Sequence, residues 1–147
     1  MSKNVRLNPK YLETGHIKID LRKQLHFDPD RLAFNLSFVT RDRRFNFEDK
    51  GFSKIVKAKL FDKMVRLSSD NFNVILGWSK SVGLENLPET AIRLAINPEF
   101  VQSHRHEDCL PDYWIFRLAN TGRVIGKIQE KTFYVLAVDT KFKLYKH

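Results

Sequence analysis

Residues 112–147 read DYWIFRLANTGRVIGKIQEKTFYVLAVDTKFKLYKH, and this stretch decides the fold. It holds three runs rich in β-branched and aromatic residues, at residues 113–119, 123–129 and 132–139, separated by short turns. The first run alternates between two faces, whereas the third is apolar on both, which is typical of a strand covered from two sides. The pattern predicts a three-stranded antiparallel meander, with Gly122 supplying a positive φ in its first turn.

Two helices are predicted upstream of the meander. Ser53 can cap a helix that runs to about Leu67, because its hydroxyl can accept a hydrogen bond from a free backbone amide of the first turn. A second helix is expected over residues 71–80, with Gly83 ending it. The short link between the two predicts an antiparallel helix hairpin. The apolar stripe that should face the core comprises Val56, Leu60, Met64 and Leu67, flanked by Phe61 and Val65.

Further strands are expected outside the meander. Residues 32–39 place apolar side chains at period two, the pattern of a half-buried strand. Residues 90–96 could form another strand, while residues 84–88 and 97–111 are interpreted as loops. Together the elements predict an α+β fold, in which an antiparallel sheet of four to five strands packs against the helix hairpin.

The chain is expected to divide into a basic arm, residues 1–31, and one α+β domain, residues 32–147. A length of 147 residues suits a single domain with its own core, and 12 phenylalanines supply much of it. No apolar run approaches the ~18 residues of a membrane span, and the N-terminal residues lack the apolar centre of a signal peptide. The single cysteine, Cys109, cannot form an internal disulfide. These features favour a soluble protein of the reducing cytoplasm.

The charge balance is the most informative total for function. Lysine and arginine number 26 against 17 aspartates and glutamates, a formal net charge of +9. Such an excess is expected of a protein that meets nucleic acid or another acidic surface. An inert, solvated basic surface would have the same composition, so the total alone leaves both interpretations open.

A first group of candidate binding residues lies at a basic tip after the first predicted strand. Arg41, Arg43 and Arg44 fall within four positions, just before Phe45 and Phe47. This arrangement can form a phosphate-contacting loop beside stacking aromatic rings. The alternative is a hairpin tip whose phenylalanines turn to the core.

A second group lies on the meander and its tail. Arg117 shares a strand face with Tyr113 and Ile115, so it interrupts an otherwise apolar surface. Cations near a scissile phosphodiester can stabilise the pentavalent transition state, and a tyrosine or histidine can move protons, so such a site needs no metal. The alternative is a tail that only extends the sheet. The candidates of this group are Arg117, Arg123, Lys127, Lys141, Lys143, Tyr145 and His147.

Metal and thiol chemistry are disfavoured. Residues 104–109 read HRHEDC, but zinc sites usually draw ligand pairs from separated turns and this chain has one compact cluster. Cys109 lacks the context of a reactive nucleophile. The sequence also has no glycine-rich phosphate loop and no serine elbow. We therefore expect no cofactor and no metal.

The predicted elements resemble the RelE/ParE superfamily of toxin-antitoxin toxins. The resemblance is carried by the strand within residues 32–39, the helices over 53–80, and above all RLANTGRVIGKIQEKTFYVLAVDTKFKLY at residues 117–145. The C-terminus is also similar to small bacterial and mobile-element proteins that end in an FYVLWLD…LY-like signature. The resemblance covers about residues 32–147.

The resemblance implies a small basic toxin that is neutralised by an acidic antitoxin partner in a hetero-oligomer. RelE-like members cut messenger RNA on the ribosome without a metal, through attack of the ribose 2′-hydroxyl on the adjacent phosphate. Carried over, Arg117 would contact the scissile phosphate, and Tyr145 or His147 would transfer a proton. Lys141 and Lys143 would hold phosphates.

A second hypothesis concerns binding without catalysis. ParE-like members poison gyrase and lack these catalytic groups. Asp139 stands where nucleases of the superfamily often have His or Arg. That substitution favours a non-catalytic protein that binds nucleic acid electrostatically or inhibits a host or phage protein. The nuclease remains the leading expectation, and a purely structural basic protein is a third.

Overall fold

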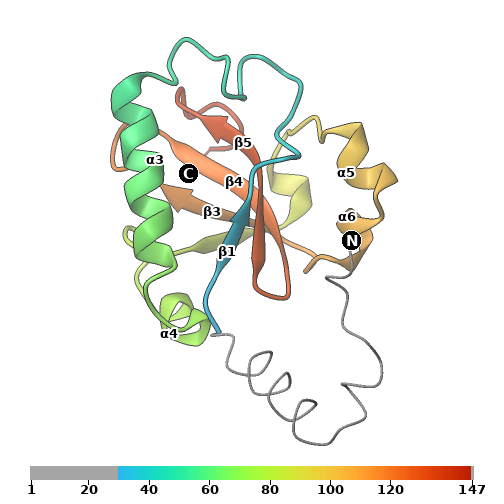
Figure 1. The fold of residues 1–147 in the computed structure, drawn as a ribbon. Coiled ribbons are helices and arrows are strands. Elements are labelled where there is room, and N and C mark those ends of the chain that lie inside the picture. Colours follow the sequence, from blue (N-terminus) through green and yellow to red (C-terminus); the bar gives the residue numbers. More distant parts are fainter. Residues whose placement is uncertain (1–29, 147) are drawn as a thin grey trace, which may run out of the picture.

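The three runs of the meander form the centre of the sheet (Figure 1). In the computed structural model, which describes residues 30–146, they are β3 (Tyr113–Arg117), β4 (Arg123–Gln129) and β5 (Thr132–Asp139). β4 pairs antiparallel with both neighbours, so the predicted meander is confirmed. Nearly all of the predicted N-terminal arm, and the last residue of the chain, lie outside the described range.

Short strands complete both edges of the sheet. β1 (Ala33–Asn35) runs parallel to β5, and β2 (Glu85–Leu87) runs antiparallel to β3. The strand order is β1-β5-β4-β3-β2. The fold is therefore α+β, with a five-stranded and mostly antiparallel sheet, as the sequence predicted.

The edge strands differ in detail from the prediction. β2 lies where a loop was expected. Residues 90–96 form no strand, and the first two of them belong to a short 3₁₀ turn, η1 (Glu89–Ala91). β1 is also shorter than the predicted strand, because the Asn35 side chain accepts a hydrogen bond from the Ser37 amide and turns the chain. Phe34 consequently packs on one face of the sheet and Phe38 on the other.

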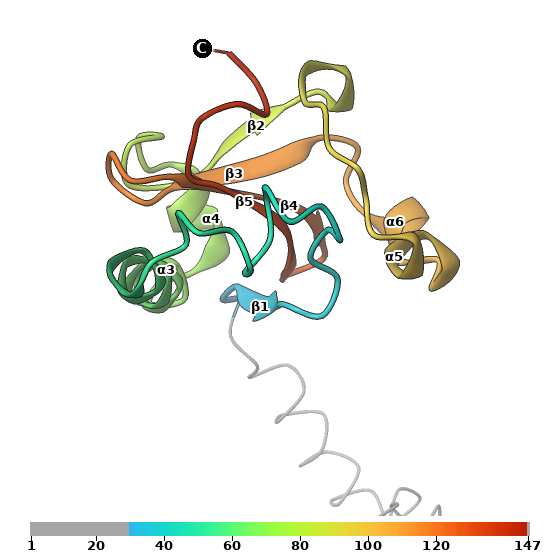
Figure 2. The ribbon, with the colours of Figure 1, turned by 90° about the horizontal axis from the view of Figure 1, so that it is seen from above.

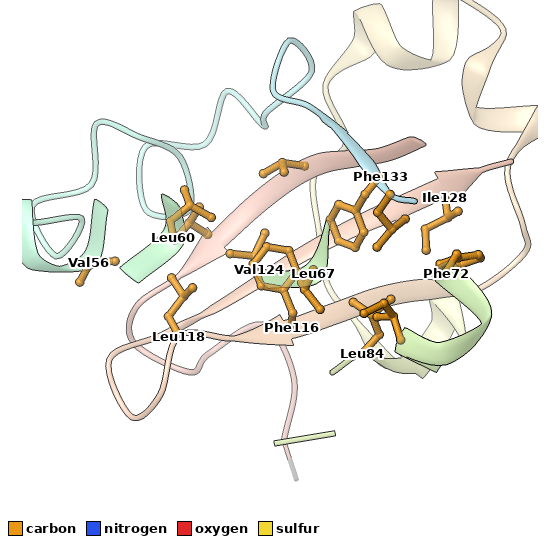
Figure 3. Packing of buried hydrophobic residues seen from close by; sticks show 14 of the residues in the cluster. Val56, Leu60, Leu67, Phe72, Leu84, Phe116, Leu118, Val124, Ile128 and Phe133 are labelled. Carbon is orange, nitrogen blue, oxygen red and sulfur yellow. The ribbon is translucent and has the colours of Figure 1, made fainter. Parts of the chain in front are cut away.

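One face of the sheet is covered by α3 (Lys54–Leu67) and α4 (Phe72–Leu76). The Ser53 hydroxyl accepts a hydrogen bond from the Val56 amide, which confirms the predicted cap. α4 is half the length expected, because the chain leaves the helix at Gly77. Figure 3 shows the resulting core between helices and sheet. Its buried members include Val56, Leu60, Leu67, Phe72, Phe116, Val124, Ile128 and Phe133.

The opposite face carries α5 (Pro98–Gln102) and α6 (Arg105–Asp108), well separated from α3 and α4 (Figure 2). A loop was predicted here, and that prediction was wrong. The Asn97 side chain caps α5 by accepting from the Glu99 amide, and Pro98 follows as the first helical residue. Phe100 from α5 is fully buried in a second core with Tyr134 and Leu136 of β5.

A bulge in β5 sets which residues reach the second face. Ile125 pairs with Ala137 but Gly126 pairs with Val135, so Leu136 is the extra residue. Leu136 and Ala137 therefore both join the second core although they are adjacent in sequence. The shift also places Asp139 directly opposite Arg123, at the start of β4.

The first turn of the meander also differs from the prediction. Ala119, and not Gly122, takes the left-handed conformation, with a φ of 54°. A Cβ at Gly122 would lie 3.3 Å from the Asp139 carbonyl oxygen, so a side chain there would need its neighbours to shift by a few tenths of an ångström. No helix within residues 30–146 has the length and apolarity needed to cross a membrane.

Candidate nucleic-acid interface

Four charged side chains form a row across the sheet, on the face away from α3. Arg117 stands directly opposite Arg123, and Arg123 directly opposite Asp139. At the Arg117 end of this row, Glu85 of β2 follows, and its Oε1 lies 3.4 Å from Arg117 Nη2. Arginines that face each other across strands repel, so the two flanking carboxylates balance them. We call Glu85, Arg117, Arg123 and Asp139 the charged row.

The two ends of the charged row differ in burial. The side chains of Arg123 and Asp139 are 1% and 0% exposed, and Arg123 Nε and Nη2 both donate to Asp139 Oδ2, at 3.1 and 3.0 Å. The Arg117 side chain is 30% exposed and that of Glu85 is 10% exposed. Solvent therefore reaches the Arg117 end, whereas the Arg123 end is enclosed in the interior.

Tyr145 from the C-terminal tail lies over the row. Its hydroxyl is 3.5 Å from Glu85 Oε1, the same oxygen that faces Arg117. Its ring covers the Arg123 guanidinium at 3.4 Å, and its carbonyl oxygen accepts from Arg123 Nη2 at 2.7 Å. Burial raises the pKa of the Tyr145 hydroxyl, so the phenol stays protonated at neutral pH and can donate a proton.

Asp139 holds the tail in place. Its carboxylate accepts hydrogen bonds from the backbone amides of Lys141, Lys143 and Leu144, at 3.3, 3.1 and 2.9 Å. Together with the bonds from Arg123, these hydrogen bonds satisfy both oxygens of the fully buried Asp139 carboxylate. Figure 2 shows the tail leaving β5 and running toward β2. This path brings Tyr145 to Glu85 and turns the lysines outward.

A cavity of about 330 Å³ lies along the same tail and is lined by cations from three segments. Arg44 belongs to the loop after β1, Arg93 precedes α5, and two lysines come from the tail. The Arg93 amide donates to the Leu144 carbonyl at 3.2 Å, which joins two of the segments. We call this cavity the basic pocket. Its lining consists of Arg44, Phe45, Arg93, Lys141, Lys143 and Leu144.

Two carboxylates stand behind the four cations of the basic pocket. Asp42 pairs with Arg44 at 2.7 Å, and Asp49 pairs with Lys141 at 3.4 Å. Burial alone would raise the pKa of Asp49, but hydrogen bonds from Thr140, the Gly51 amide and Lys141 outweigh it and lower the pKa, so Asp49 is charged.

The other two cations of the pocket are not neutralised. Within residues 30–146, neither Arg93 nor Lys143 has a carboxylate at ion-pair distance. Four cations against two carboxylates leave the pocket with an excess of two positive charges.

The three arginines of the predicted basic tip lie in different environments. Arg44 enters the basic pocket, while Arg41 pairs with Glu99 and Arg43 with Glu48, each at 3.3 Å on the surface. Neither Arg41 nor Arg43 lines the pocket. The Phe45 side chain is buried in the second core, in agreement with the alternative that the phenylalanines serve packing.

Two cations predicted to bind nucleic acid are placed in the interior. Arg123 and Lys127 are each 1% exposed, so neither offers its charge to a ligand in this structure. Lys127 is bound by the Glu89 carboxylate and by the carbonyl oxygens of Leu110 and Pro111, at 3.3 and 2.8 Å. The expectation of direct contact is corrected because a central strand has no exposed face once both sheet surfaces are covered.

The Lys127–Glu89 pair predicts a specific acid sensitivity. Burial of Glu89 opposes its charge, but the bond to Lys127 prevails and lowers the pKa of Glu89. A lowered folded-state pKa contributes stability above the unfolded value of about 4.5 that is lost as pH falls through the folded value. The Glu89 side chain is 41% exposed, so solvent screens the pair, and Glu89→Gln should cost no more than about 1 kcal/mol at pH 7 and less at pH 3, as measured by urea unfolding. An equal cost at both pH values would contradict this linkage.

Two residues of the interface were missed in the sequence. Glu85 and Arg93 lie in segments whose strand and loop assignments were exchanged, so neither was placed near the tail. A run of three residues between Leu84 and Pro88 is too short to show alternation. His147, a predicted proton donor, lies outside the described residues.

Metal and thiol sites find no support in the described part of the chain. Within residues 30–146 no three His, Cys, Asp or Glu side chains gather as metal ligands would. His106 instead faces Glu89 at 3.4 Å, and His104 faces Glu107. Burial raises the pKa of the Cys109 thiol to about 11, which keeps it unreactive at neutral pH.

Comparisons with protein-family models, with curated proteins and with solved structures found no match to this chain. Any functional conclusion therefore depends on the geometry of the charged row, Tyr145 and the basic pocket.

Proposed function

We propose that this protein is a RelE-like toxin that cuts messenger RNA on the ribosome without a metal. The observation that carries the proposal is the meeting of three groups from distant segments: Arg117 and Tyr145 both face one oxygen of Glu85. A cation, a carboxylate and a protonated phenol within one contact shell are the groups that phosphodiester transesterification requires.

Each group has a defined role in this proposal. The Glu85 carboxylate takes the proton of the ribose 2′-hydroxyl as the O2′–P bond forms. Arg117 balances the negative charge that grows on the non-bridging phosphate oxygens. Tyr145 gives its proton to the 5′-oxygen as the P–O5′ bond breaks. The products are a 2′,3′-cyclic phosphate and a free 5′-hydroxyl.

The contacts among these groups are loose enough to exchange for substrate. The Arg117–Glu85 and Tyr145–Glu85 distances are 3.4 and 3.5 Å, whereas a firm charge-assisted hydrogen bond measures about 2.7–2.9 Å. A phosphate that binds Arg117 in two-pronged fashion would displace Glu85 and leave its carboxylate free to act as a base.

The proposal includes an acidic antitoxin as the partner. One feature of α3 supports it: Ile55, Phe61 and Val65 are more than half exposed on this helix. They lie among Lys54, Lys57 and Arg66, which are also exposed. Exposed apolar side chains with cations on the same helix are the groups that an acidic amphipathic segment would contact.

Substitutions in the site are expected to abolish cleavage while leaving the fold intact. Arg117→Ala and Tyr145→Phe should each lower the cleavage rate by roughly 100-fold or more, because each removes one transition-state contact. The assay is primer extension on transcripts after induction, followed by cleavage of messenger RNA on purified ribosomes. Chelation of divalent ions in the ribosome-free control should leave any residual cleavage unchanged.

Lys80→Ala is the control, because it removes an exposed cation that lies outside the charged row and the basic pocket. It should cut at the wild-type rate, and a 2′-deoxy substitution at the cut position should block the wild-type protein. Full activity in both site variants would remove the assignment of Arg117 and Tyr145.

A second function, binding without cleavage, is favoured by Asp139. The position where nucleases of the superfamily often carry His or Arg is occupied by a buried carboxylate that folds the tail. A binder would release no 2′,3′-cyclic ends, and its affinity for RNA would fall steeply with salt as counterions are released.

A further inference from the structure

We propose that the basic pocket binds the phosphate monoester of a nucleotide. The pocket is separate from the Arg117–Glu85–Tyr145 contacts, and the inference goes beyond RNA cleavage because neither requires the other. It rests on the charge, the rigidity and the size of the pocket.

The charge of the pocket matches a dianion. Four cations against Asp42 and Asp49 leave an excess of two positive charges. A phosphate monoester carries about −1.5 to −2 at pH 7, with a second pKa of about 6, whereas a backbone diester carries one charge. Arg93 and Lys143, which have no carboxylate partner among residues 30–146, are the groups left to meet the ligand.

The backbone around the pocket and the Arg44 side chain are held in position before any ligand arrives. Asp139 fixes the Lys143 backbone, and the Arg93 amide is bonded to the Leu144 carbonyl. Asp42 grips the Arg44 guanidinium through two hydrogen bonds, at 3.1 and 2.7 Å. Groups that are already ordered cost less entropy on binding, so more of the electrostatic attraction appears as affinity.

The pocket is larger than a phosphate group alone requires. Its volume of about 330 Å³ lies at the lower end of the range for small-molecule sites, about 300–1,000 Å³. Phe45 and Leu144 contribute an apolar wall beside the cations. This combination suits a phosphate that carries a nucleoside.

Two sources could supply such a group: a free mononucleotide, or the phosphorylated 5′ end of an RNA. Leu144 lines the pocket and the next residue, Tyr145, faces Glu85. An RNA held by its 5′ phosphate would therefore extend along the tail toward the charged row. The two sources share the phosphate chemistry and differ in whether one nucleoside or a longer chain is attached to it.

The test is calorimetric titration of the full chain with adenosine 5′-monophosphate and with adenosine. A 2′-O-methylated hexanucleotide, with and without a 5′ phosphate, distinguishes the two sources and cannot be cut. The variants are Arg93→Gln and Lys143→Gln. The matched control is Lys146→Gln, which removes an exposed tail lysine that does not line the pocket.

Adenosine 5′-monophosphate should bind and adenosine should not, and binding should weaken below pH 6 as the monoester takes up a proton. Each pocket variant should weaken binding by roughly tenfold or more, since each removes a charged donor, while Lys146→Gln should bind as wild type does. Tighter binding of the 5′-phosphorylated oligonucleotide than of the mononucleotide identifies an RNA end, and equal binding identifies a free nucleotide.

Two outcomes would overturn the inference. One is an affinity that does not change when the phosphate is removed, for the mononucleotide and for the oligonucleotide. The other is an equal loss of binding in Lys146→Gln and Lys143→Gln, which would mean that only general positive charge matters. Because no probe can be cut, these outcomes leave the cleavage proposal to its own test.

Discussion

Asp139→Asn is expected to destabilise the protein by about 3–5 kcal/mol, because it neutralises the buried carboxylate that pairs with the Arg123 guanidinium. Arg123 is 1% exposed and makes two hydrogen bonds to Asp139 Oδ2. The amide also offers one acceptor oxygen where the carboxylate offers two to the tail. The measurement is the free energy of unfolding in urea.

Glu48→Gln is the control for this substitution, because it makes the same chemical change in a surface pair. The Arg43 and Glu48 side chains are 82% and 65% exposed, so the control should cost less than about 1 kcal/mol. A double-mutant cycle that adds Arg123→Met would then measure the coupling energy between Arg123 and Asp139. The variant with both substitutions has no buried charge at these positions, so it should recover part of the lost stability. An Asp139→Asn protein as stable as wild type would show that the buried pair does not hold the tail.

Gly126→Ala is expected to cost about 3 kcal/mol or more, because β4 has no room for a methyl group at the β5 bulge. A Cβ there would lie under 3.0 Å from the Tyr134 carbonyl oxygen and from the Phe133 ring, a separation that real Cβ atoms essentially never show. Backbone and a fully buried ring cannot move aside cheaply. Thermal and urea unfolding would measure the loss.

Gly77→Ala supplies the matched comparison. Gly77 has an ordinary φ of −84°, and its added Cβ would meet only the Val74 carbonyl oxygen at 3.4 Å. The same methyl group should therefore change stability by less than about 1 kcal/mol, and in the stabilising direction, because alanine restricts the unfolded chain. If both variants unfolded at the wild-type urea concentration, the tight packing at the bulge would be disproved.

The sequence predicted best those elements whose pattern repeats. The Ser53 cap and the apolar stripe of α3 span four turns, and the meander spans three strands, so both were placed correctly. Short elements without a repeat were misplaced: β2, α5 and α6 have three to five residues each. The Asn97–Pro98 pair is a readable start signal for α5, and it was missed when residues 97–111 were interpreted as a loop.

Most residues of the candidate interface could be chosen from the sequence, but the contacts between them could not be predicted. Arg117, Tyr145, Lys141 and Lys143 were chosen for their chemistry and their place on the sheet and tail. No local pattern relates Glu85 to Tyr145, which is 60 positions away and reaches it only because the tail folds back. The burial of Lys127 could not be predicted from the sequence either, because it depends on contacts with Glu89 and with two carbonyl oxygens before β3.

By itself, the sequence determined the α+β class, the meander, the α3 cap and the excess of positive charge, because these depend on local periodicity and on totals. The tertiary structure decided which cations are buried pairs and which stay available. That division depends on strand register: the bulge at Leu136 sets Asp139 opposite Arg123, and the buried carboxylate then folds the tail that presents Tyr145 and the lysines. Register is a property of paired strands, so no single run of residues contains it.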